Sequence, residues 1–223
     1  MTSPKLLSYI NANEITFSDA WKLQQTIFDK RKSGAIDDTL ILLEHPHTYT
    51  LGKTAKREHL IYNEKQLEEQ GISVFDIDRG GDITYHGPGQ IVGYPIIDLN
   101  NWKKDTHLYL RELEQVLIDM LKEYGIESGR KEGLTGVWIE DRKIAAIGIK
   151  ISSWITMHGF AVNINTDLGL FSGIIPCGIR DKKVTSLAKE LNAEVVIGEV
   201  KTKIVNQFMN HFGYDSLGPV LAE

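Results

Sequence analysis

The single cysteine of the chain, Cys177, lies between a proline and a glycine in the stretch IIPCGIRDKK. Proline and glycine disfavour a regular helix or strand, so we expect this thiol on a sharply shaped loop. Positive charge nearby lowers the pKa of a thiol and turns it into a nucleophile, and Arg180, Lys182 and Lys183 follow closely. The alternatives are an inert packed thiol and a solvated run of charges.

Lys143 is the second residue that could do chemistry. It begins the run KIAAIGIKI, in which positions 143, 145, 147, 149 and 151 are expected to share one face of a strand. Because the other members of this row are apolar, burial should lower the pKa of the lysine and let it act as a base. The alternative is a strand-end lysine whose ammonium reaches water.

A glycine-rich segment, RGGDITYHGPGQ at 79–90, combines glycines, whose backbone can approach a ligand closely, with polar side chains. It matches neither the G-x-G-x-x-G nor the phosphate-loop pattern, so it carries no nucleotide fingerprint. We expect it to form one wall of a cleft, with tight turns flanking a short strand as the plainer interpretation.

The histidines give weaker signals. His45 and His47 flank a proline, and no cluster of further ligands follows, so we predict no metal site. His86 and His158 each precede a glycine. Either could orient the cysteine, or be a satisfied buried polar group.

The elements that must position these residues alternate irregularly. Expected strands lie at 39–44, 48–51, 72–77 and 155–166, two more within 79–99, and a hairpin at 136–151 that turns at 140–142. Expected helices lie at 16–32, 63–71, 106–124, about 186–192 and 199–212. Because strands and helices mix without regular βαβ alternation, the sequence predicts an α+β fold with a mixed β-sheet packed with helices.

Composition bounds the class of protein. The 223 residues are 42% hydrophobic, without repeats or linker-like stretches, which favours a single domain over 1–223. A formal net charge of −5 argues against a nucleic-acid partner bound through overall positive charge, and leaves open only a local basic patch; we predict no nucleic-acid partner. No apolar run is long enough for a membrane span, and no secretory signal or cysteine pair is visible. We therefore expect a cytoplasmic protein with no membrane partner, and a monomer, because no helix shows a long heptad seam.

Five motifs together resemble the octanoyltransferase family, the lipoyl(octanoyl) transferases of lipoate biosynthesis. From about residue 40 to about residue 190 they occur in the family's order and approximate spacing: EHPHTYTLG (44–52), RGGDITYHGPGQIVGYPIIDL (79–99), GVWI with KIAAIGIKI (136–151), HGFAVNIN (158–165) and IIPCGI (174–179).

The resemblance implies a biotin/lipoate protein ligase-like catalytic domain. It implies transfer of octanoyl from octanoyl-acyl carrier protein to a lysine of lipoyl domains, in 2-oxoacid dehydrogenase subunits and the glycine-cleavage carrier protein. No ATP, metal or other cofactor is required, because the donor thioester is already activated.

The resemblance also implies roles for individual residues. Cys177 would carry the octanoyl group as a thioester and Lys143 would be its base, with oxyanion donors on the backbone beside Cys177 and on the glycine-rich strand. The residues expected to bind the acyl chain are Arg79, Gly80, Gly81, Asp82, Ile83, Thr84, Tyr85, His86, Ala146, Ile147, Gly148, Gly159, Phe160 and Ala161.

The resemblance also bears on the docking surface for partners and on alternative functions. Acyl carrier proteins are acidic whereas this chain is net negative, so docking is expected on a local basic surface: Lys53, Lys56, Arg57, Arg180, Lys182 and Lys183. The rivals are an ATP-dependent lipoate or biotin ligase on the same fold, a Cys–His thioesterase using His86 or His158, and a non-catalytic acyl-binding module.

Overall fold

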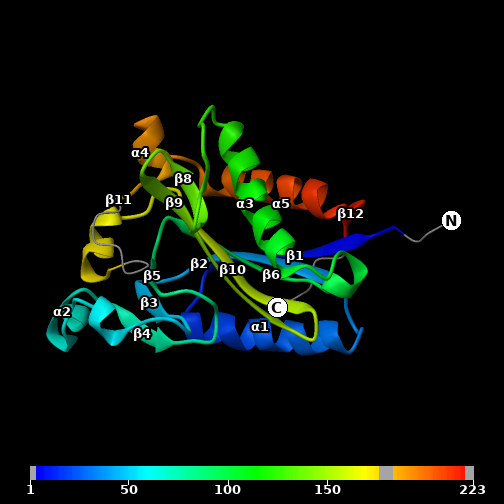
Figure 1. Ribbon diagram of the computed structural model, residues 1–223, viewed down its shortest axis with the longest axis horizontal. Helices are drawn as coiled ribbons and strands as arrows, with labels where there is room; N and C mark the ends of the chain where they lie inside the picture. The colour runs from blue at the N-terminus through cyan, green and yellow to red at the C-terminus, as the bar shows by residue number, and fades with distance from the viewer. Residues whose placement is uncertain (1–3, 176–182, 219–223) are drawn as a thin grey trace.

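A computed structural model describes residues 4–175 and 183–218 of the chain. Its centre is a nine-stranded sheet (Figure 1). Across the sheet the strands are β12 (Ser216–Leu217), β1 (Leu6–Glu14), β2 (Asp38–Glu44), β6 (Gln90–Ile96), β10 (Ile155–Asn163), β9 (Arg142–Ser152), β8 (Leu134–Ile139) and β7 (Gly129–Lys131), with β11 (Lys183–Val184) also pairing with β9. Parallel and antiparallel pairs both occur, which confirms the predicted mixed sheet.

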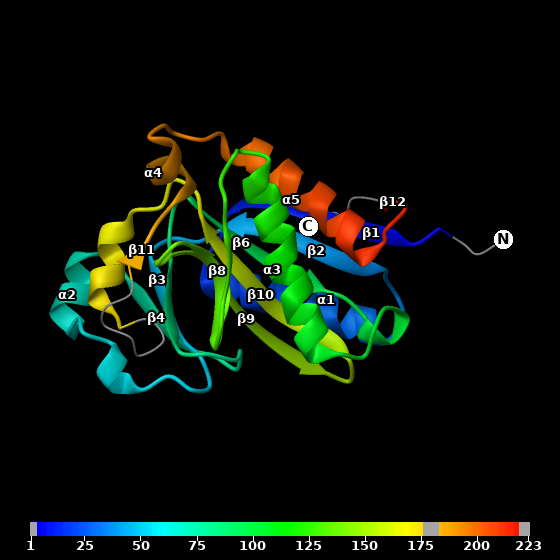
Figure 2. The same cartoon turned by 45° about the horizontal axis from the view of Figure 1, so that its top comes forward.

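Helices cover both faces of this sheet. Figure 1 shows α1 (Phe17–Lys32) along one face, whereas Figure 2 shows α3 (Thr106–Lys122) beside α5 (Ile197–Phe212) over the other. Each face has its own core: α3 and α5 enclose the larger cluster, and α1 packs on Val92, Tyr94 and Ala161. The remaining helices are α2 (Glu64–Glu69) and α4 (Leu187–Leu191), and the 3-10 turns are η1 (Arg57–His59), η2 (Leu99–Asn101) and η3 (Leu168–Gly173).

A second, three-stranded sheet lies at one end of the first. It consists of β4 (Ser73–Asp76), β3 (Thr48–Leu51) and β5 (Ile83–His86), in that order. Its own core, with Tyr49 and Tyr85 at the centre, packs against η3. The glycine-rich segment therefore passes from this small sheet into β6 of the large one, as its predicted turn–strand–turn–strand pattern indicates.

Local sequence signals explain where the two long helices on either side of the sheet begin. Thr16 caps α1 by accepting the N–H of Asp19 at 3.2 Å, and Asp105 caps α3 by accepting the N–H of Leu108 at 2.9 Å. Both helices then bury one stripe, which includes Phe17 in α1 and Leu113 in α3. These helices agree with prediction to within a residue or two. None of the described helices is long and apolar enough to cross a membrane.

Candidate active site

A cavity of about 580 Å³ lies on the α1 side of the large sheet, under the segment that connects β4 to β5. Its floor includes a row of residues from three adjacent strands, because Ala161 on β10 pairs with Val92 on β6 and with Ala146 on β9. Directly paired residues project from the same face of a sheet. Phe17 of α1 and Tyr94 of β6 also line the cavity. The floor of the cavity is therefore mostly apolar, which suits an alkyl chain.

The segment around Arg79 forms the opposite wall and approaches β9 very closely. The Gly80 N–H donates to the carbonyl of Ile149 at 2.9 Å. A Cβ at position 148 would lie 2.8 Å from the carbonyl oxygen of Gly80 and 2.9 Å from Cδ of Arg79. Gly148 was predicted to contact the acyl chain, but its lack of a side chain makes room for the protein's own wall. Ala146, also predicted to contact the acyl chain, lies on the floor of the cavity.

The side chain of Arg79 ties this wall to the small sheet. Its Nη2 donates to the backbone carbonyl of Thr50 at 2.8 Å and to the Thr50 hydroxyl at 3.0 Å. Beside it, Asp78 accepts from Lys150 at 2.5 Å and from Nε2 of His158 at 2.9 Å. Burial works to raise the pKa of Asp78, but these hydrogen bonds outweigh it and hold the pKa below its usual range.

Lys143 reaches the cavity through a β-bulge. Val137 pairs with Ala145, but the next residue, Trp138, pairs with Lys143, so β9 has one more residue than β8 between these two pairs. The bulge places Lys143 on the face of Trp138, opposite to Ala145. The prediction that Lys143 shares a face with residues 145–151 is therefore wrong, and the extra residue in β9 is the reason.

Two neighbours define the place where the lysine side chain lies. The Nζ of Lys143 is 5.2 Å from the centre of the Trp138 ring, within the range of a cation–π contact. A Cβ at position 136 would lie 2.6 Å from Cε of Lys143, so the lysine lies against the bare backbone of Gly136. Lys143 and Trp138 thus line the β8–β9 end of the cavity, and Val92 and Tyr94 line its β6 end. With adjacent strands ~4.8 Å apart, β6 lies about 10 Å across the sheet from β9 and about 14 Å from β8.

A chain of buried hydrogen bonds connects the glycine-rich strand to the backbone of Lys143. His86 Nδ1 donates to Gln90 Oε1 at 2.8 Å, and Gln90 Nε2 donates to Asn163 Oδ1 at 2.9 Å. Asn163 Nδ2 donates to the carbonyl of Thr185 at 3.0 Å, and the Thr185 N–H donates to the carbonyl of Lys143 at 3.0 Å. Each amide in this chain has one orientation, because its oxygen accepts and its nitrogen donates.

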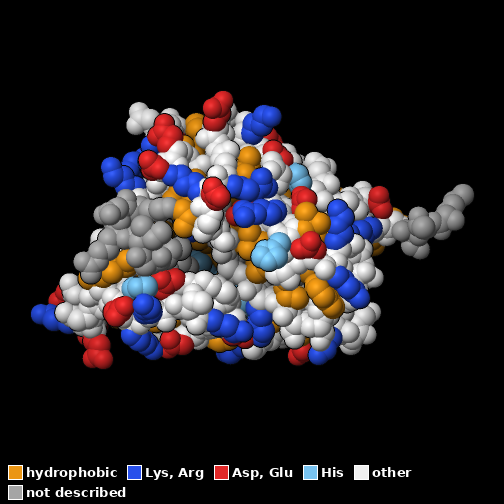
Figure 3. All heavy atoms as spheres, in the orientation of Figure 1, with side chains coloured by type: hydrophobic (Ala, Val, Ile, Leu, Met, Phe, Trp, Pro, Cys, Tyr) orange, Lys and Arg blue, Asp and Glu red, His pale blue; other side chains and the backbone are white. Residues whose placement is uncertain are grey.

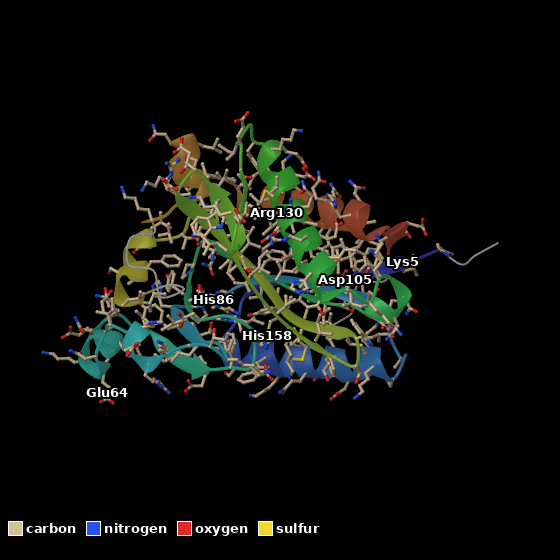
Figure 4. All side chains as sticks on the ribbon, viewed as in Figure 1. Lys5, Glu64, His86, Asp105, Arg130 and His158 are labelled. Carbon is tan, nitrogen blue, oxygen red and sulfur yellow. The ribbon has the colours of Figure 1, made fainter. Side chains whose placement is uncertain are left out.

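The two histidines that line the cavity are labelled in Figure 4, and each is hydrogen-bonded to another side chain, His86 to Gln90 and His158 to Asp78. Full burial lowers the pKa of His86 to about 3, so its imidazole is neutral near pH 7. Burial also lowers the pKa of His158, although its hydrogen bond to Asp78 opposes that effect. His86 and His158 are therefore structural supports of the cavity walls, and a Cys–His hydrolase mechanism gains no support from their environment.

Most of the predicted acyl-binding residues do line this cavity. It brings together Lys143 with Arg79, Gly80, Gly81, Asp82, Ile83, Thr84, His86, Ala146, Ile147, Gly148, Gly159, Phe160 and Ala161. Tyr85 does not belong to this group, because β5 alternates and turns its side chain into the core of the small sheet, where its hydroxyl pairs with His47 Nδ1 at 2.8 Å. Cys177 lies outside the described residues.

Other lining residues were not predicted from the sequence. Phe17, Trp138 and Asn163 come from a helix, a bulged strand and a strand end, far apart in the chain. Their types are those of ordinary core residues, so composition and spacing carried no signal for them. Gln90 closes the motif TYHGPGQ, which is the one sequence feature that pointed toward it.

The predicted basic docking surface is only partly described. Arg57 donates to Asp76 at 2.5 Å, and Lys56 lies 3.8 Å from Glu58, so acidic partners offset two of its charges. Lys183 is exposed at the start of β11, whereas Arg180 and Lys182 lie outside the described residues. Figure 3 shows a separate group of basic side chains in the middle of one face, where Figure 4 labels Arg130.

The two histidines weighed as metal ligands have other partners. Both ring nitrogens of His45 are engaged, Nδ1 with the carbonyl of Ile15 at 2.8 Å and Nε2 with the hydroxyl of Tyr94 at 2.7 Å. Among residues 4–175 and 183–218, no group of three or more His, Cys, Asp or Glu side chains is arranged to hold a metal ion.

Comparison with known proteins gives both a family and a fold. Residues 16–209 match the family model described as the lipoyl protein ligase A/B catalytic domain. An octanoyltransferase of Flavobacterium johnsoniae is 51% identical over 213 residues, which cover 88% of this chain and 92% of the relative. The solved bi-partite lipoate protein ligase of Thermoplasma acidophilum superposes with a TM-score of 0.75 at 17% identity, over 98% of this chain and 88% of that one. The biotin protein ligase of Aquifex aeolicus gives a TM-score of 0.52 at 13% identity, over 94% and 69%.

The chain is thus a lipoyl protein ligase A/B catalytic domain, and its fold is the one that lipoate and biotin protein ligases share. Within that class the chain belongs to the octanoyltransferase family, as its identity to such relatives over most of its length shows. It is an enzyme of octanoyl transfer in protein lipoylation.

Proposed function

We propose that the enzyme takes octanoyl from the thioester of an acyl carrier protein, holds it as a thioester on Cys177, and passes it to a lysine of a lipoyl domain. The acceptors would be the lipoyl domains of 2-oxoacid dehydrogenase subunits and the glycine-cleavage carrier protein. The observation that carries the proposal is that one cavity has both an apolar floor, formed by Val92, Ala161 and Ala146, and Lys143 in its lining. The Thermoplasma ligase was solved in a study with its E2 lipoyl domain, which supports a lipoyl domain as acceptor.

The first half-reaction moves the acyl group to the enzyme. Lys143 accepts the proton of the Cys177 thiol, and the thiolate attacks the carbonyl carbon of the donor thioester. A new carbon–sulfur bond forms, the old one breaks, and the carrier's thiolate leaves and takes up a proton. Because one thioester replaces another, the acyl group stays activated and no nucleotide is consumed.

The second half-reaction moves the acyl group to the acceptor. The substrate lysine gives up a proton to Lys143, and its neutral amine attacks the acyl-enzyme carbonyl. A carbon–nitrogen bond forms, the bond to Cys177 breaks, and the thiolate is released to be protonated again. Backbone N–H groups beside Cys177 and on the glycine-rich strand are the proposed donors to the oxyanion.

Intact mass spectrometry after mixing with octanoyl-acyl carrier protein tests the covalent step. We expect one octanoyl adduct on the wild-type enzyme, which hydroxylamine removes and which the Cys177→Ala variant never forms. Turnover of the alanine variant at the wild-type rate would contradict a Cys177 intermediate. The Lys143→Ala variant should form the same adduct at least about 100-fold more slowly, since general base catalysis contributes ~10² to 10⁴.

Nucleotide dependence separates the proposal from a ligase. An ATP-dependent lipoate or biotin-type ligase on this fold would need free acid and ATP, and would be inactive with octanoyl-carrier alone. We expect transfer from octanoyl-carrier to a lipoyl domain in nucleotide-free buffer. Release of free octanoate as the main product, with a lipoyl domain present, would instead indicate a thioesterase.

A further inference from the structure

A buried carboxylate on α3 faces the hairpin formed by β7 and β8. Glu114 is fully buried, and its Oε2 accepts from Arg111 Nη1 at 2.7 Å and from Arg130 Nε at 2.9 Å. Its Oε1 accepts the backbone N–H of Gly136 at 2.9 Å. A buried carboxylate is tolerated only when such partners replace its hydration, so these contacts hold α3, β7 and β8 in one arrangement. Figure 4 shows Arg130 beside α3.

Gly136 meets this carboxylate where the strand ladders around it are irregular. The pairing of β7 with β8 shifts register between Gly129 and Lys131, and that of β8 with β9 shifts at Val137. A regular ladder would fix the position of a strand residue through its neighbours on both sides. Here the ladders are irregular, so the hydrogen bond from the Gly136 N–H to Glu114 helps to fix the position of Gly136 relative to α3.

The residue so anchored is the one on which Lys143 lies. Gly136 has a φ of +120°, and a Cβ there would lie 2.6 Å from Cε and 3.3 Å from Nζ of Lys143. Any shift of Gly136 toward or away from the cavity therefore moves the surface that supports the lysine side chain. Glu114 touches Gly136 from the α3 side, and Lys143 touches it from the cavity side.

We infer that Glu114 is a positioning residue for Lys143, acting through the backbone of Gly136. It contacts no reacting atom; its role is to hold the lysine at the distance that proton transfer requires. This inference rests on the proposed function of Lys143 as the base. It adds a residue from the opposite face of the sheet to the catalytic arrangement.

Substitution of Glu114 tests the inference. The Glu114→Ala variant should lower kcat for octanoyl transfer about 10- to 100-fold with KM within about twofold, because a displacement of ~1 Å at a catalytic group costs up to ~10²-fold. The Glu114→Gln variant retains an amide oxygen for the Gly136 N–H, so it should keep more of kcat than the alanine variant. Thermal unfolding of both variants is measured alongside, and assays are run well below each Tm.

Asp38 provides a matched control far from the cavity. It is also a buried carboxylate, which accepts from Arg31 Nε at 2.7 Å and from the backbone N–H of Asp98 at 2.7 Å. The Asp38→Asn variant should lose stability much as Glu114→Gln does, yet keep kcat within about twofold, because an interaction distant from the reacting groups contributes to stability alone. Equal losses of kcat in the two variants would overturn the inference.

A double variant tests whether Glu114 acts through Lys143. If Glu114 acts through the lysine, Glu114→Ala should cause no further loss of the single-turnover acylation rate in a Lys143→Ala background. Losses that multiply would overturn the inference and leave the proposed function standing. If the Lys143→Ala variant alone were acylated at the wild-type rate, both the inference about Glu114 and the proposed role of Lys143 as base would be overturned. If Cys177 formed no adduct, the proposed nucleophile would be overturned.

Discussion

At the β6 end of the cavity the lining is aromatic. Phe17 is the first residue of α1 and is almost completely buried. Its ring lies 5.0 Å from that of Phe75 and 5.4 Å from that of His45, centre to centre. An acyl chain whose carbonyl is near Lys143 would extend toward this ring, so Phe17 is well placed to limit the length of the chain.

Shortening this side chain should therefore change chain-length selectivity. We expect Phe17→Leu to raise kcat/KM for a decanoyl donor relative to an octanoyl donor by about tenfold, since one methylene in an apolar pocket is worth ~1–3 kcal/mol. Competition between the two donors, read by the mass of the lipoyl-domain product, measures the ratio. Phe28→Leu on the same helix is the control, because Phe28 packs on the α1 core and does not line the cavity. An unchanged ratio in Phe17→Leu would refute this role.

At the scale of elements, the hydrogen bonds from His86 through Gln90 and Asn163 to Thr185 join β5, β6 and β10 to the residue that follows β11. Replacing Asn163 by alanine would leave one N–H of the Gln90 amide and the Thr185 carbonyl without their present partner, although Gln90 Nε2 still donates to the carbonyl of Tyr85 at 3.0 Å. Each buried group left unpaired costs ~1–3 kcal/mol. Because Thr185 also binds the backbone of Lys143, we expect Asn163→Ala to lower kcat about tenfold in addition to Tm.

The neighbouring Asn165 makes a close control for that prediction. Its amide donates to the carbonyl of Val195 at 2.8 Å and its oxygen accepts the Val195 N–H at 3.0 Å, so it anchors a different loop. Asn165→Ala should lower Tm similarly while kcat changes by no more than about twofold, because sites without shared partners act independently. A loss of kcat in both variants would show that the effect is one of stability alone.

The same elements show what the sequence could and could not predict. Helices α1 and α3 and the hairpin of β8 and β9 follow from capping residues, periodicity and turn signals, and the mixed sheet follows from their order. β1 was missed, because its polar residues, such as Asn11 and Asn13, hide the strand pattern and its bulge breaks the pairing with β2. The bulge that turns Lys143 into the cavity depends on strand pairing, which adjacent residues do not encode.

The motifs identified the glycine-rich wall and Lys143, but they did not separate cavity residues from core residues. Tyr85 lies within the wall motif and yet faces the core of the small sheet. Glu114 resembles any helix glutamate in the sequence, and only the packing of α3 on β8 reveals its contact with Gly136. The roles of such residues arise from tertiary contacts, so a single sequence carries no signal for them.

At the scale of the whole molecule, the cavity is built against the core between α1 and the sheet. Two histidines are buried in that region, and burial lowers the pKa of His45 to about 4 and that of His86 to about 3. In the unfolded chain both would titrate near their ordinary value of 6.5. Between those values the unfolded state binds protons that the folded state does not, so stability falls as pH decreases.

The pH dependence of unfolding should report this burial. Each histidine should contribute about 1.4 kcal/mol per pH unit to the loss of unfolding free energy below pH ~6.5, ending near pH ~4 for His45. Replacing His45 by glutamine removes its proton while keeping hydrogen-bonding groups for the Ile15 carbonyl and the Tyr94 hydroxyl. The slope of unfolding free energy against pH should then become shallower by about that amount between pH 6 and 4.5.

Urea unfolding of wild type and His45→Gln at several pH values gives the two slopes directly. Groups such as Asp78, whose folded pKa is also low, contribute equally to both proteins and cancel in the difference. The same change at the exposed His107 controls for the substitution itself. Parallel slopes for wild type and His45→Gln would mean that His45 is protonated in the folded protein, which its burial argues against.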